Sequence, residues 1–384
     1  MKDSQPKYFI ISDFYIRSNN RGSAALGYGA IVFLMQKGYI DADCEIVRYS
    51  FYRNPFRRHH NNKIEELDIN GQCWKLHTLS VWSFEKLLYR IGLHFFNTAF
   101  RRTVKHLKLV AALNGGDGLT DIYGEKLLEY RLPEMKFAIE FGIPFVVMPQ
   151  TIGPFLSDAN KERILAFLRL ADKIYVRDTN FVRVLEQEGL QYEKTNDLSY
   201  FMKPVPVSMT IQKPCVGINV SGLAYSNNFG NLVGQFDAYP RLMSELVKLF
   251  QSKKLNVYLI PHAYNVKQPE TNNDDMVATR QFYETLEDKT NVHFVDVDLI
   301  SPQVKWAISQ MDFFVGTRMH ANYAAIFTHI PVFGLAYSYK FKGAFEENGI
   351  YNRTADIKGL PESKIADVVK AVDMAYQEDV LQDE

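Results

Sequence analysis

The stretch FFVGTRMHANYAAIFTHIPVFGLA, residues 313–336, carries the pattern that decides the fold. Its first four residues, Phe313–Gly316, form a short β-rich run. Arg318–Phe327 then shows the apolar spacing of a helix, and Pro331–Ala336 is β-rich again. A strand, a helix and a second strand in this order predict one parallel βα unit.

The same alternation of short β-rich runs and helical patterns continues through most of the chain. Helices are expected at Gly124–Phe141, Asp158–Leu170 and Tyr239–Phe250. The strand candidates form two series, with Tyr8–Phe14, Cys44–Phe51, Lys108–Asn114, Pro144–Met148 and Lys173–Arg177 in the first and Cys215–Val220, Leu255–Pro261, Val292–Val297, Phe313–Gly316 and Pro331–Ala336 in the second. We therefore expect an α/β protein of two Rossmann-like, doubly wound domains. The Pro-rich stretch Lys203–Pro214 is the predicted linker, which places the domains at residues 1–205 and 206–384.

Composition excludes several classes of protein. The 384 residues are 47% hydrophobic, and 44 Lys and Arg balance 44 Asp and Glu, so a disordered or collagen-like chain is excluded. Cys44, Cys73 and Cys215 lack the spacing of metal ligands, so we expect reduced core thiols and neither disulfides nor a metal site. The start shows no export signal, and no segment reaches about 18 consecutive apolar residues. We expect a cytoplasmic protein.

Charge is unevenly distributed along the chain. Residues 1–110 hold 17 Lys and Arg against nine Asp and Glu. The whole chain is neutral, however, so no nucleic-acid partner is expected. Within this part, Ser83–Leu109 reads as one long helix in which aromatic residues alternate with cations, and RNPFRRHH (residues 53–60) adds positive charge. A crossover helix packed on the sheet is the first interpretation. The alternative is a helix that lies on an anionic membrane.

Candidate functional residues lie after the predicted strands, because ligands of open α/β sheets collect at the carboxyl ends of the strands. Thr317 stands between a strand and a helix, where its hydroxyl suits an N-cap. Arg318 and His320 would then lie in the first helical turn, beside unpaired amides. The arginine could grip a phosphate or carboxylate, and the imidazole could transfer a proton. The alternative is an arginine paired with a nearby carboxylate and a packed histidine.

A Gly-rich loop follows a strand of the first series. Its residues Asn114, Gly115 and Gly116 could bring backbone close to a ligand, or form a tight turn without one. The loop matches neither GxGxxG nor a Walker A sequence, so dinucleotide or ATP binding is not indicated. Asp117 and Asp121 offer carboxylates for a base or for sugar hydroxyls, and the alternative is that either residue caps the following helix.

Three further cationic candidates follow strands. His262 comes directly after LNVYLIP, and Lys340 comes just past PVFGLAY. Arg177 is followed by Asp178, so the two could form an ion pair at the end of a strand instead of binding a ligand.

Taken together, these motifs resemble the polysaccharide pyruvyl transferase family. The most specific is GTRMHANYAAIFTHIPVFGLAYSYKFKG (316–343), which is similar to a Gly-Thr-Arg-x-His block followed by an Ala-rich helix, a Pro-Val strand and a Lys. Weaker matches are NGGDGLTD (114–121), QTIGPF (150–155), YVRD (175–178) and LIPH (259–262). Ser23 departs from the family, whose members usually have Asp there, and so does the segment Thr179–Arg183, which lacks the usual Ser.

The resemblance implies a GT-B-like fold, with two Rossmann-like domains that face a cleft. It implies an N-terminal acceptor domain and a C-terminal domain for phosphoenolpyruvate, with a last helix that packs back on the N-terminal domain. Members move the enolpyruvyl carbons of phosphoenolpyruvate onto two sugar hydroxyls, which gives a pyruvate ketal and phosphate. No cofactor is implied.

By matching motif, Arg318 would hold the donor and His320 would act beside it, with Lys340 and Arg177 as lesser ligands. Asp117 is a candidate partner of His320 on the acceptor side. The implied acceptor is a sugar of a capsule or exopolysaccharide repeat, still attached to a lipid carrier. Two alternatives remain open, a GT-B glycosyltransferase that uses a nucleotide sugar and a non-catalytic carbohydrate-binding protein.

Overall fold

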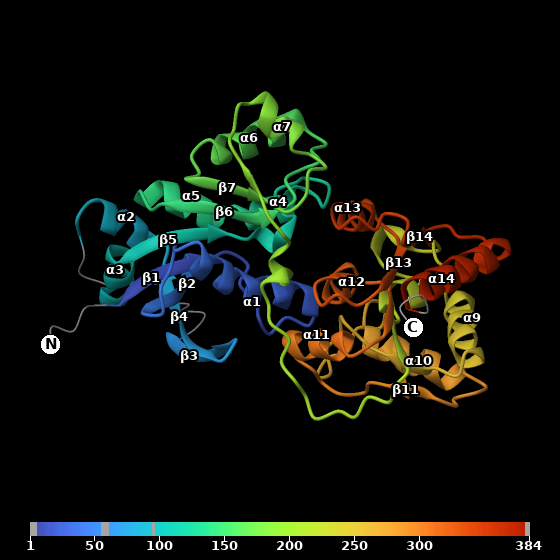
Figure 1. Ribbon diagram of the computed structural model, residues 1–384. Helices are drawn as coiled ribbons and strands as arrows, with labels where there is room; N and C mark the ends of the chain where they lie inside the picture. Colours follow the sequence, from blue (N-terminus) through green and yellow to red (C-terminus); the bar gives the residue numbers. More distant parts are fainter. Residues whose placement is uncertain (1–5, 55–60, 94–96, 381–384) are drawn as a thin grey trace. The chain divides into compact units, whose positions relative to one another are not determined.

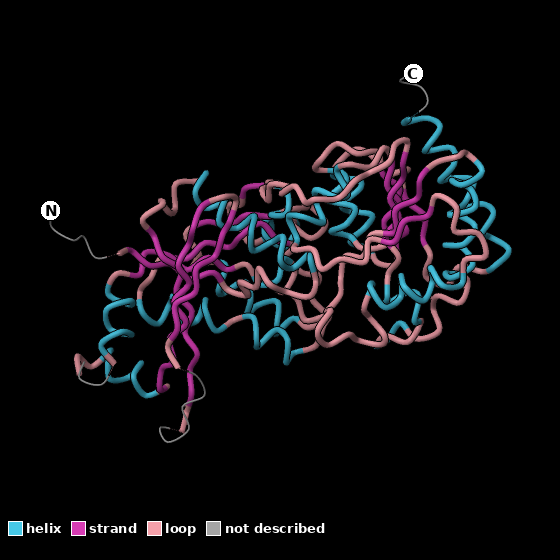
Figure 2. The backbone as a smooth tube through the Cα atoms, turned by 90° about the horizontal axis from the view of Figure 1, so that it is seen from below, coloured by secondary structure: helices cyan, strands magenta, loops and turns pink. Residues whose placement is uncertain are grey.

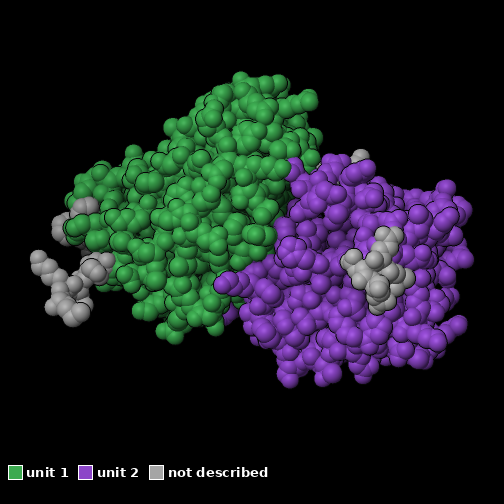
Figure 3. Space-filling view, in the orientation of Figure 1, with its two compact units in different colours: residues 1–14, 26–201 green, residues 15–25, 202–384 purple. Residues whose placement is uncertain are grey.

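The computed structural model describes residues 6–54, 61–93 and 97–380. The chain divides into two compact units (Figure 3). Unit 1 comprises residues 1–14 and 26–201, and unit 2 comprises residues 15–25 and 202–384. Unit 2 therefore includes a short segment, residues 15–25, that the sequence-based division at residue 205 assigned to the first domain.

Unit 1 is built on a sheet in which eight described strands follow the order β3-β4-β2-β1-β5-β6-β7-β8. The strands are β1 (Lys7–Ile11), β2 (Cys44–Tyr52), β3 (Lys63–Ile69), β4 (Gln72–Trp82), β5 (Leu107–Ala112), β6 (Phe145–Gln150), β7 (Lys173–Val176) and β8 (Glu193–Lys194). Neighbours are parallel except β3 and β4, which form an antiparallel hairpin. The strand order reverses between β1 and β5, which makes this pair the topological switch point of unit 1.

The β3–β4 hairpin is absent from the sequence-based prediction. Asn70 and Gly71 connect its strands, and both have positive φ, 55° and 79°. This backbone conformation is that of a two-residue hairpin turn, for which Asn-Gly is the preferred sequence.

Helices of unit 1 cover both faces of its sheet (Figure 1). They are α1 (Arg21–Gln36), whose first residues belong to unit 2, α2 (Phe84–Arg90), α3 (Thr98–Lys105), α4 (Glu125–Arg131), α5 (Pro133–Phe141), α6 (Asp158–Leu168) and α7 (Arg183–Gln187), with 3₁₀ turns η1 (Asn114–Gly116) and η2 (Leu198–Tyr200). The helix predicted at Gly124–Phe141 is divided between α4 and α5, because Pro133 has no N–H with which to continue α4.

The prediction of one long helix over Ser83–Leu109 is wrong. Helix α2 ends at Arg90, and Gly92 follows with a φ of +80°, which an α-helix does not accommodate. Asn97 begins α3, since its side chain accepts a hydrogen bond of 2.9 Å from the Phe100 N–H. Strand β5 starts at Leu107. Residues 55–60 and 94–96 of this basic region lie outside the described part of the chain.

Unit 2 contains a parallel sheet whose six described strands follow the order β11-β10-β9-β12-β13-β14. These are β9 (Cys215–Asn219), β10 (Asn256–Leu259), β11 (Val292–Phe294), β12 (Phe313–Gly316), β13 (Val332–Ala336) and β14 (Thr354–Asp356). The helices are α8 (Gly222–Ser226), α9 (Tyr239–Ser252), α10 (Asp275–Thr285), α11 (Ser301–Ser309), α12 (Met319–Ile326), α13 (Tyr339–Glu347) and α14 (Ile365–Val380), with 3₁₀ turns η3 (Gly230–Leu232) and η4 (Glu362–Lys364). The switch point lies between β9 and β12.

Alternate residues of the unit 2 strands pack on opposite faces of the sheet. Val257 and Leu259 belong to a core cluster with residues of α9 and α14. Tyr258 and Ile260 belong to a second cluster with residues of α11, α12 and α13. The helices lie on the two sides of the strands in Figures 1 and 2, so the sheet is doubly wound as expected.

The last helix, α14, buries Val372 and Tyr376 in the core of unit 2. One sequence expectation needs correction. Cys73 is exposed at the β3–β4 hairpin instead of being a core thiol, whereas Cys44 and Cys215 are buried. None of the helices in the described residues has the length and apolar character needed to span a bilayer.

Candidate functional site

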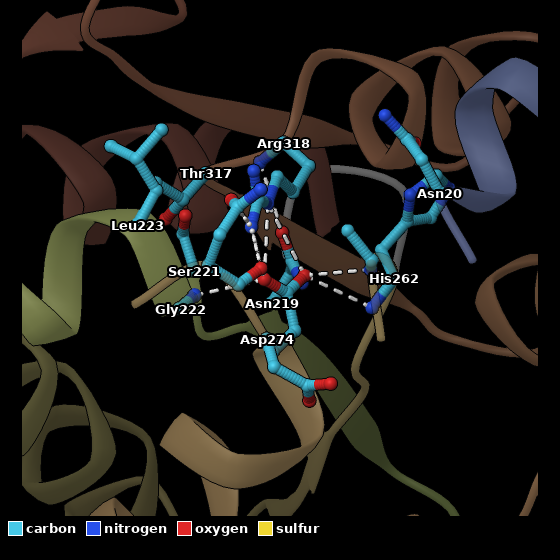
Figure 4. A network of polar contacts seen from close by, with 12 residues as sticks. Asn20, Asn219, Ser221, Gly222, Leu223, His262, Asp274, Thr317 and Arg318 are labelled. Atoms are coloured by element: carbon cyan, nitrogen blue, oxygen red, sulfur yellow. Dashed lines mark hydrogen bonds and ion pairs between the residues drawn. The ribbon is translucent and has the colours of Figure 1, made fainter. Parts of the chain in front are cut away.

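The loops at the switch point of unit 2 meet in one polar network (Figure 4). Asn219–Gly222 leaves β9, and Thr317–His320 leaves β12. His262 follows β10, the next strand of the sheet. The sequence analysis identified Thr317, Arg318, His320 and His262, and the fold places all four at the carboxyl edge of one sheet.

Asp275 is the centre of this network and was missed by the sequence analysis. Its carboxylate is fully buried at the start of α10. One oxygen accepts the Gly222 N–H at 2.8 Å, and the other accepts the N–H groups of His262 and Ala263 at 3.1 and 3.0 Å. One carboxylate thus ties together the loops after β9 and β10.

Arg318 gives the same carboxylate its countercharge. Its Nη2 lies 2.6 Å and its Nε 3.0 Å from Asp275 Oδ1. Nη2 also donates to the backbone and side-chain oxygens of Asn273, both at 2.9 Å. The alternative of an arginine paired with a nearby carboxylate therefore holds, and the fork formed by Nε and Nη2 is occupied. Nη1 is the guanidinium nitrogen outside these bonds.

The start of α12 differs from the prediction by one residue. Arg318, not Thr317, is the N-cap, and its own N–H donates to Asn219 Oδ1 at 2.9 Å. Thr317 is fully buried, and its hydroxyl lies 2.8 Å from the Tyr239 hydroxyl. Thr317 therefore joins the loop to α9 and does not present its hydroxyl to a ligand.

Arg318 remains a cation in this environment. Burial works against the charged form, but the Asp275 carboxylate and the Tyr337 hydroxyl outweigh it and raise the pKa of Arg318 above its ordinary value. Its side chain is 12% exposed. A charged group that is nearly buried yet still reachable suits the binding of an anion.

The N-terminal segment of unit 2 packs directly on the site. Asn20 caps α1 by accepting the Gly22 N–H at 3.0 Å, and it pairs with Ala263 in a β-bridge. A Cβ at Gly22 would lie 2.5 Å from Nδ1 of His320. Glycine is therefore required here by the close approach of α1 to the imidazole.

Arg21 anchors this segment. Its Nε donates to the Leu299 carbonyl at 2.7 Å, and Nη2 pairs with Asp298 at 2.8 Å. Its guanidinium carbon lies 4.0 Å from the centre of the Tyr264 ring. The backbone N–H of Arg21 donates to the His262 carbonyl. A buried arginine thus fixes residues 15–25 beside both histidines.

His262 has an unusual environment for an ionisable group. It is 4% exposed, and its ring nitrogens have no hydrogen-bond partner among the described residues. Burial lowers the pKa of His262 well below its ordinary value, and the charges of His320, Arg318 and Arg21 act in the same direction. The imidazole is therefore neutral near pH 7, able to donate one hydrogen bond and accept another. Ser221 Oγ is also buried without a partner.

The Gly-rich loop lies at the switch point of unit 1, and its residues contact other parts of that unit. The Asn114 side chain donates to the Arg131 carbonyl at 2.8 Å, and its N–H donates to Ser12 Oγ. A Cβ at Gly115 would lie 2.6 Å from the Arg131 guanidinium, and one at Gly116 would lie 2.8 Å from Leu26. Both glycines have positive φ. These contacts support the tight-turn interpretation of Asn114, Gly115 and Gly116 over that of a ligand cradle.

The two acidic candidates of this loop differ. Asp117 accepts a hydrogen bond of 2.9 Å from the Tyr123 hydroxyl and is partly exposed. Asp121 accepts the N–H groups of Leu156 and Ser157 at 2.7 and 3.0 Å, so it organises the chain before α6. Of the two, only Asp117 keeps a carboxylate that a ligand could reach.

Arg177 lies 3.7 Å from its predicted partner Asp178, and its closer ion pair is with a different carboxylate. Its Nη1 pairs with Asp197 at 2.8 Å, and its Nε donates to Thr151 at 3.0 Å. The side chains of Arg177 and Asp197 are 3% and 0% exposed. The assignment of Arg177 as a substrate ligand therefore lacks support, since its charge is buried and paired within unit 1. Lys340 lies in α13, and its side chain falls outside the described part of the structure.

A comparison with protein-family models identifies the chain. The model of the polysaccharide pyruvyl transferase family matches residues 20–339. The chain belongs to the polysaccharide pyruvyl transferase family. The match begins at Asn20 and includes Gly22, Asp275, Arg318 and His320, so every part of the unit 2 site belongs to the family region of this transferase.

Among the solved structures with a similar fold are two UDP-N-acetylglucosamine 2-epimerases. The putative UDP-N-acetylglucosamine 2-epimerase of Listeria monocytogenes is 10% identical, with a TM-score of 0.53 over 98% of this chain and 91% of that chain. The UDP-GlcNAc 2-epimerase of Methanocaldococcus jannaschii is 10% identical, with a TM-score of 0.51 over 96% and 91%. No curated protein matches the chain. These likenesses establish a GT-B-like fold of two Rossmann-like domains and nothing about the substrate.

Proposed function

We propose that this pyruvyl transferase uses phosphoenolpyruvate as its donor and forms a cyclic pyruvate ketal on a saccharide. The observation that carries the proposal is the unit 2 site, in which the family's Arg318 and His320 stand at the sheet switch point beside a neutral, buried His262. The family match supports the reaction class, and the polar network supplies the residues.

The donor is a small, highly charged anion, and the start of α12 offers a site for one. The first turn of a helix presents unpaired N–H groups and the positive end of its dipole. Arg318 stays charged there, and its guanidinium, which also interacts with the Tyr337 hydroxyl, is the cation that we assign to a carboxylate or phosphate oxygen of the donor. Asp275 already neutralises the charge of Arg318 in the free protein. We therefore expect Arg318 to orient the donor as much as to attract it. Lys340 completes the proposed donor side, and Thr317, whose hydroxyl bonds Tyr239, only holds the loop that carries Arg318.

Ketal formation adds one proton to the enol carbon and removes one from each of two sugar hydroxyls, and the remaining proton leaves with the phosphate. A proton is added to the CH2 carbon of the enol, the first sugar hydroxyl attacks the resulting cationic carbon and its proton leaves. Phosphate then departs with its bonding electrons, and the second hydroxyl attacks and loses its proton. The products are the ketal and inorganic phosphate, and no oxidant or reductant takes part.

We assign the proton transfers to His320, with His262 beside it. The charge of His320 acts on His262, so the two imidazoles are close enough to influence each other. A neutral His262 can hold the acceptor hydroxyl or receive its proton. Asp117, in unit 1, is the proposed contact of the acceptor. We further propose that this acceptor is a sugar of a capsule or exopolysaccharide repeat carried on a lipid.

The test is an activity assay with phosphoenolpyruvate and a panel of lipid-linked oligosaccharides. The proposal predicts release of phosphate and a product heavier than the acceptor by pyruvate less one water. His320→Ala should abolish both signals with an unchanged circular dichroism spectrum, while His293→Ala, a histidine that stacks on Tyr258 away from the site, should keep both. Normal turnover in His320→Ala would remove this residue from the mechanism.

A further inference from the structure

Helix α2 presents an apolar face to solvent. Phe84, Leu87 and Ile91 are spaced three and four residues apart and are 44%, 44% and 59% exposed, and Leu93 beyond them is 44% exposed. Glu85 and Leu88 of the same helix are buried. Isolated apolar residues are common on surfaces, but four neighbouring large ones mark a contact surface.

Helix α3 next to it presents cations. Its exposed positions are Arg101, Arg102 and Lys105, while Phe100 and Val104 are buried. The helix contains no acidic residue, and none of the three cations forms an ion pair with a described carboxylate. Their charge is therefore not compensated by the part of the protein that the structure describes.

The two helices lie side by side in unit 1. Tyr89 of α2 and Phe100 of α3 are in ring contact, with centroids 6.1 Å apart. Figure 1 places the two helices at the same end of the unit 1 sheet. An apolar ridge and an uncompensated basic helix thus belong to one region of the surface.

We propose that α2 and α3 form a docking surface for an anionic lipid bilayer, with the α2 side chains entering the interface and the α3 cations contacting the headgroups. Apolar insertion and headgroup attraction are the two contributions that bind interfacial helices to membranes. A nucleic acid would use the cations but gain nothing from four apolar side chains. A symmetric contact with a second copy would bring like charges of α3 together.

The test is co-sedimentation of the full-length protein with vesicles of phosphatidylcholine alone or mixed with phosphatidylglycerol. We expect binding to the mixed vesicles only, reduced by salt. Leu87→Ser with Ile91→Ser, and separately Arg101→Glu with Arg102→Glu, should each reduce the partition at least tenfold. Leu170→Ser and Lys126→Glu with Arg183→Glu, at exposed positions elsewhere in unit 1, should retain it.

The assay needs no substrate, so its result is independent of the proposed function. Circular dichroism of each variant excludes loss of folding as the cause of a reduced partition. Equal binding to both kinds of vesicle, or unchanged binding of both double variants, would overturn the proposal. So would a dimer in sedimentation equilibrium that Leu87→Ser with Ile91→Ser dissociates, because the apolar face would then be a protein interface.

Discussion

Single side chains decide how the site is held, and Gly22 shows this most directly. The glycine has no side chain, and a Cβ in its place would lie 2.5, 2.6 and 2.8 Å from Nδ1, Cγ and Cβ of His320. These separations are far below van der Waals contact, so the imidazole would have to move. The sequence contains this glycine in the segment Asn20–Ser23, but it does not indicate the residue against which the glycine packs.

Gly22→Ala should therefore displace His320 and reduce kcat at least tenfold, with a smaller change in the KM for phosphoenolpyruvate. Steady-state kinetics of the variant measure this difference. Ser23→Ala, at the next position of α1, is the matched control and should behave as wild type. An unchanged kcat in Gly22→Ala would show that the position of the imidazole does not limit turnover.

Arg318→Lys tests whether the guanidinium fork matters beyond its charge. Lysine retains the ion pair with Asp275 but cannot also donate in a fixed geometry to Asn273 and to a donor oxygen. We expect the affinity for phosphoenolpyruvate to fall about tenfold or more by titration calorimetry. Arg280→Lys, at an exposed ion pair with Asp296, should leave it unchanged. If Arg318→Lys bound phosphoenolpyruvate as tightly as wild type, the residue would act through its charge alone.

At the scale of elements, Asp275 connects parts of unit 2 that are distant in sequence. Its carboxylate accepts hydrogen bonds from the loops after β9 and β10 and pairs with the residue that caps α12. Removing one partner of a buried ion pair leaves the other charge uncompensated, which is far more costly than losing an exposed pair.

Asp275→Asn should consequently destabilise the protein by about 3–5 kcal/mol in urea unfolding. Asp296→Asn, which removes the partner of Arg280 in an exposed ion pair, is the control and should cost about 1 kcal/mol or less. Adding Arg318→Gln to Asp275→Asn should recover part of the loss, because no unpaired charge then remains. A cost for Asp275→Asn no larger than that of the control would contradict the central role of this carboxylate.

Glu134 is a half-buried carboxylate in the first turn of α5, where the helix dipole favours its charged form but does not outweigh the loss of solvent. Burial raises the pKa of Glu134 to about 7, and Asp13 adds to the shift although Arg48 and Arg131 oppose it. The folded protein therefore favours the protonated form. Stability from this preference is fully present below the ordinary value of about 4.5 and is lost as the pH rises through 7.

Glu134→Gln should be more stable than wild type by about 1–3 kcal/mol at pH 8 and equally stable near pH 4. Urea unfolding at the two pH values measures the difference. Glu125→Gln, exposed in the first turn of α4, should bring no gain at either pH. A variant that is less stable than wild type at pH 8 would mean that the Glu134 carboxylate is charged and satisfied in the folded protein.

Elements with strong periodicity were predictable from the sequence, and those interrupted by local signals were not. Phe313–Gly316 was predicted with the bounds that β12 has. The β3–β4 hairpin was missed because it lies outside the βα alternation, although Asn70-Gly71 is a turn signal. Gly92 and Asn97 divide Ser83–Leu109, and their local backbone effects outweigh the apolar spacing that predicted one helix.

On the scale of the whole molecule, the architecture and the family followed from motif order, whereas the composition of the site did not. Arg318, His320 and His262 were predictable because they follow strands of one sheet. Asp275 was not, because nothing in Asn272–Met276 indicates which loops its carboxylate will join. The packing of residues 15–25 in unit 2 depends on tertiary contacts such as that of Arg21 with Leu299.

The central claim is that the unit 2 site binds phosphoenolpyruvate, and titration calorimetry of the purified protein tests it most directly. Phosphoenolpyruvate should be compared with UDP-N-acetylglucosamine and a GDP-sugar, for wild type and Arg318→Ala. We expect binding of phosphoenolpyruvate alone, and we expect it to be lost in Arg318→Ala. Binding of a nucleotide sugar with no response to phosphoenolpyruvate would contradict it and indicate a nucleotide-sugar enzyme on the same fold.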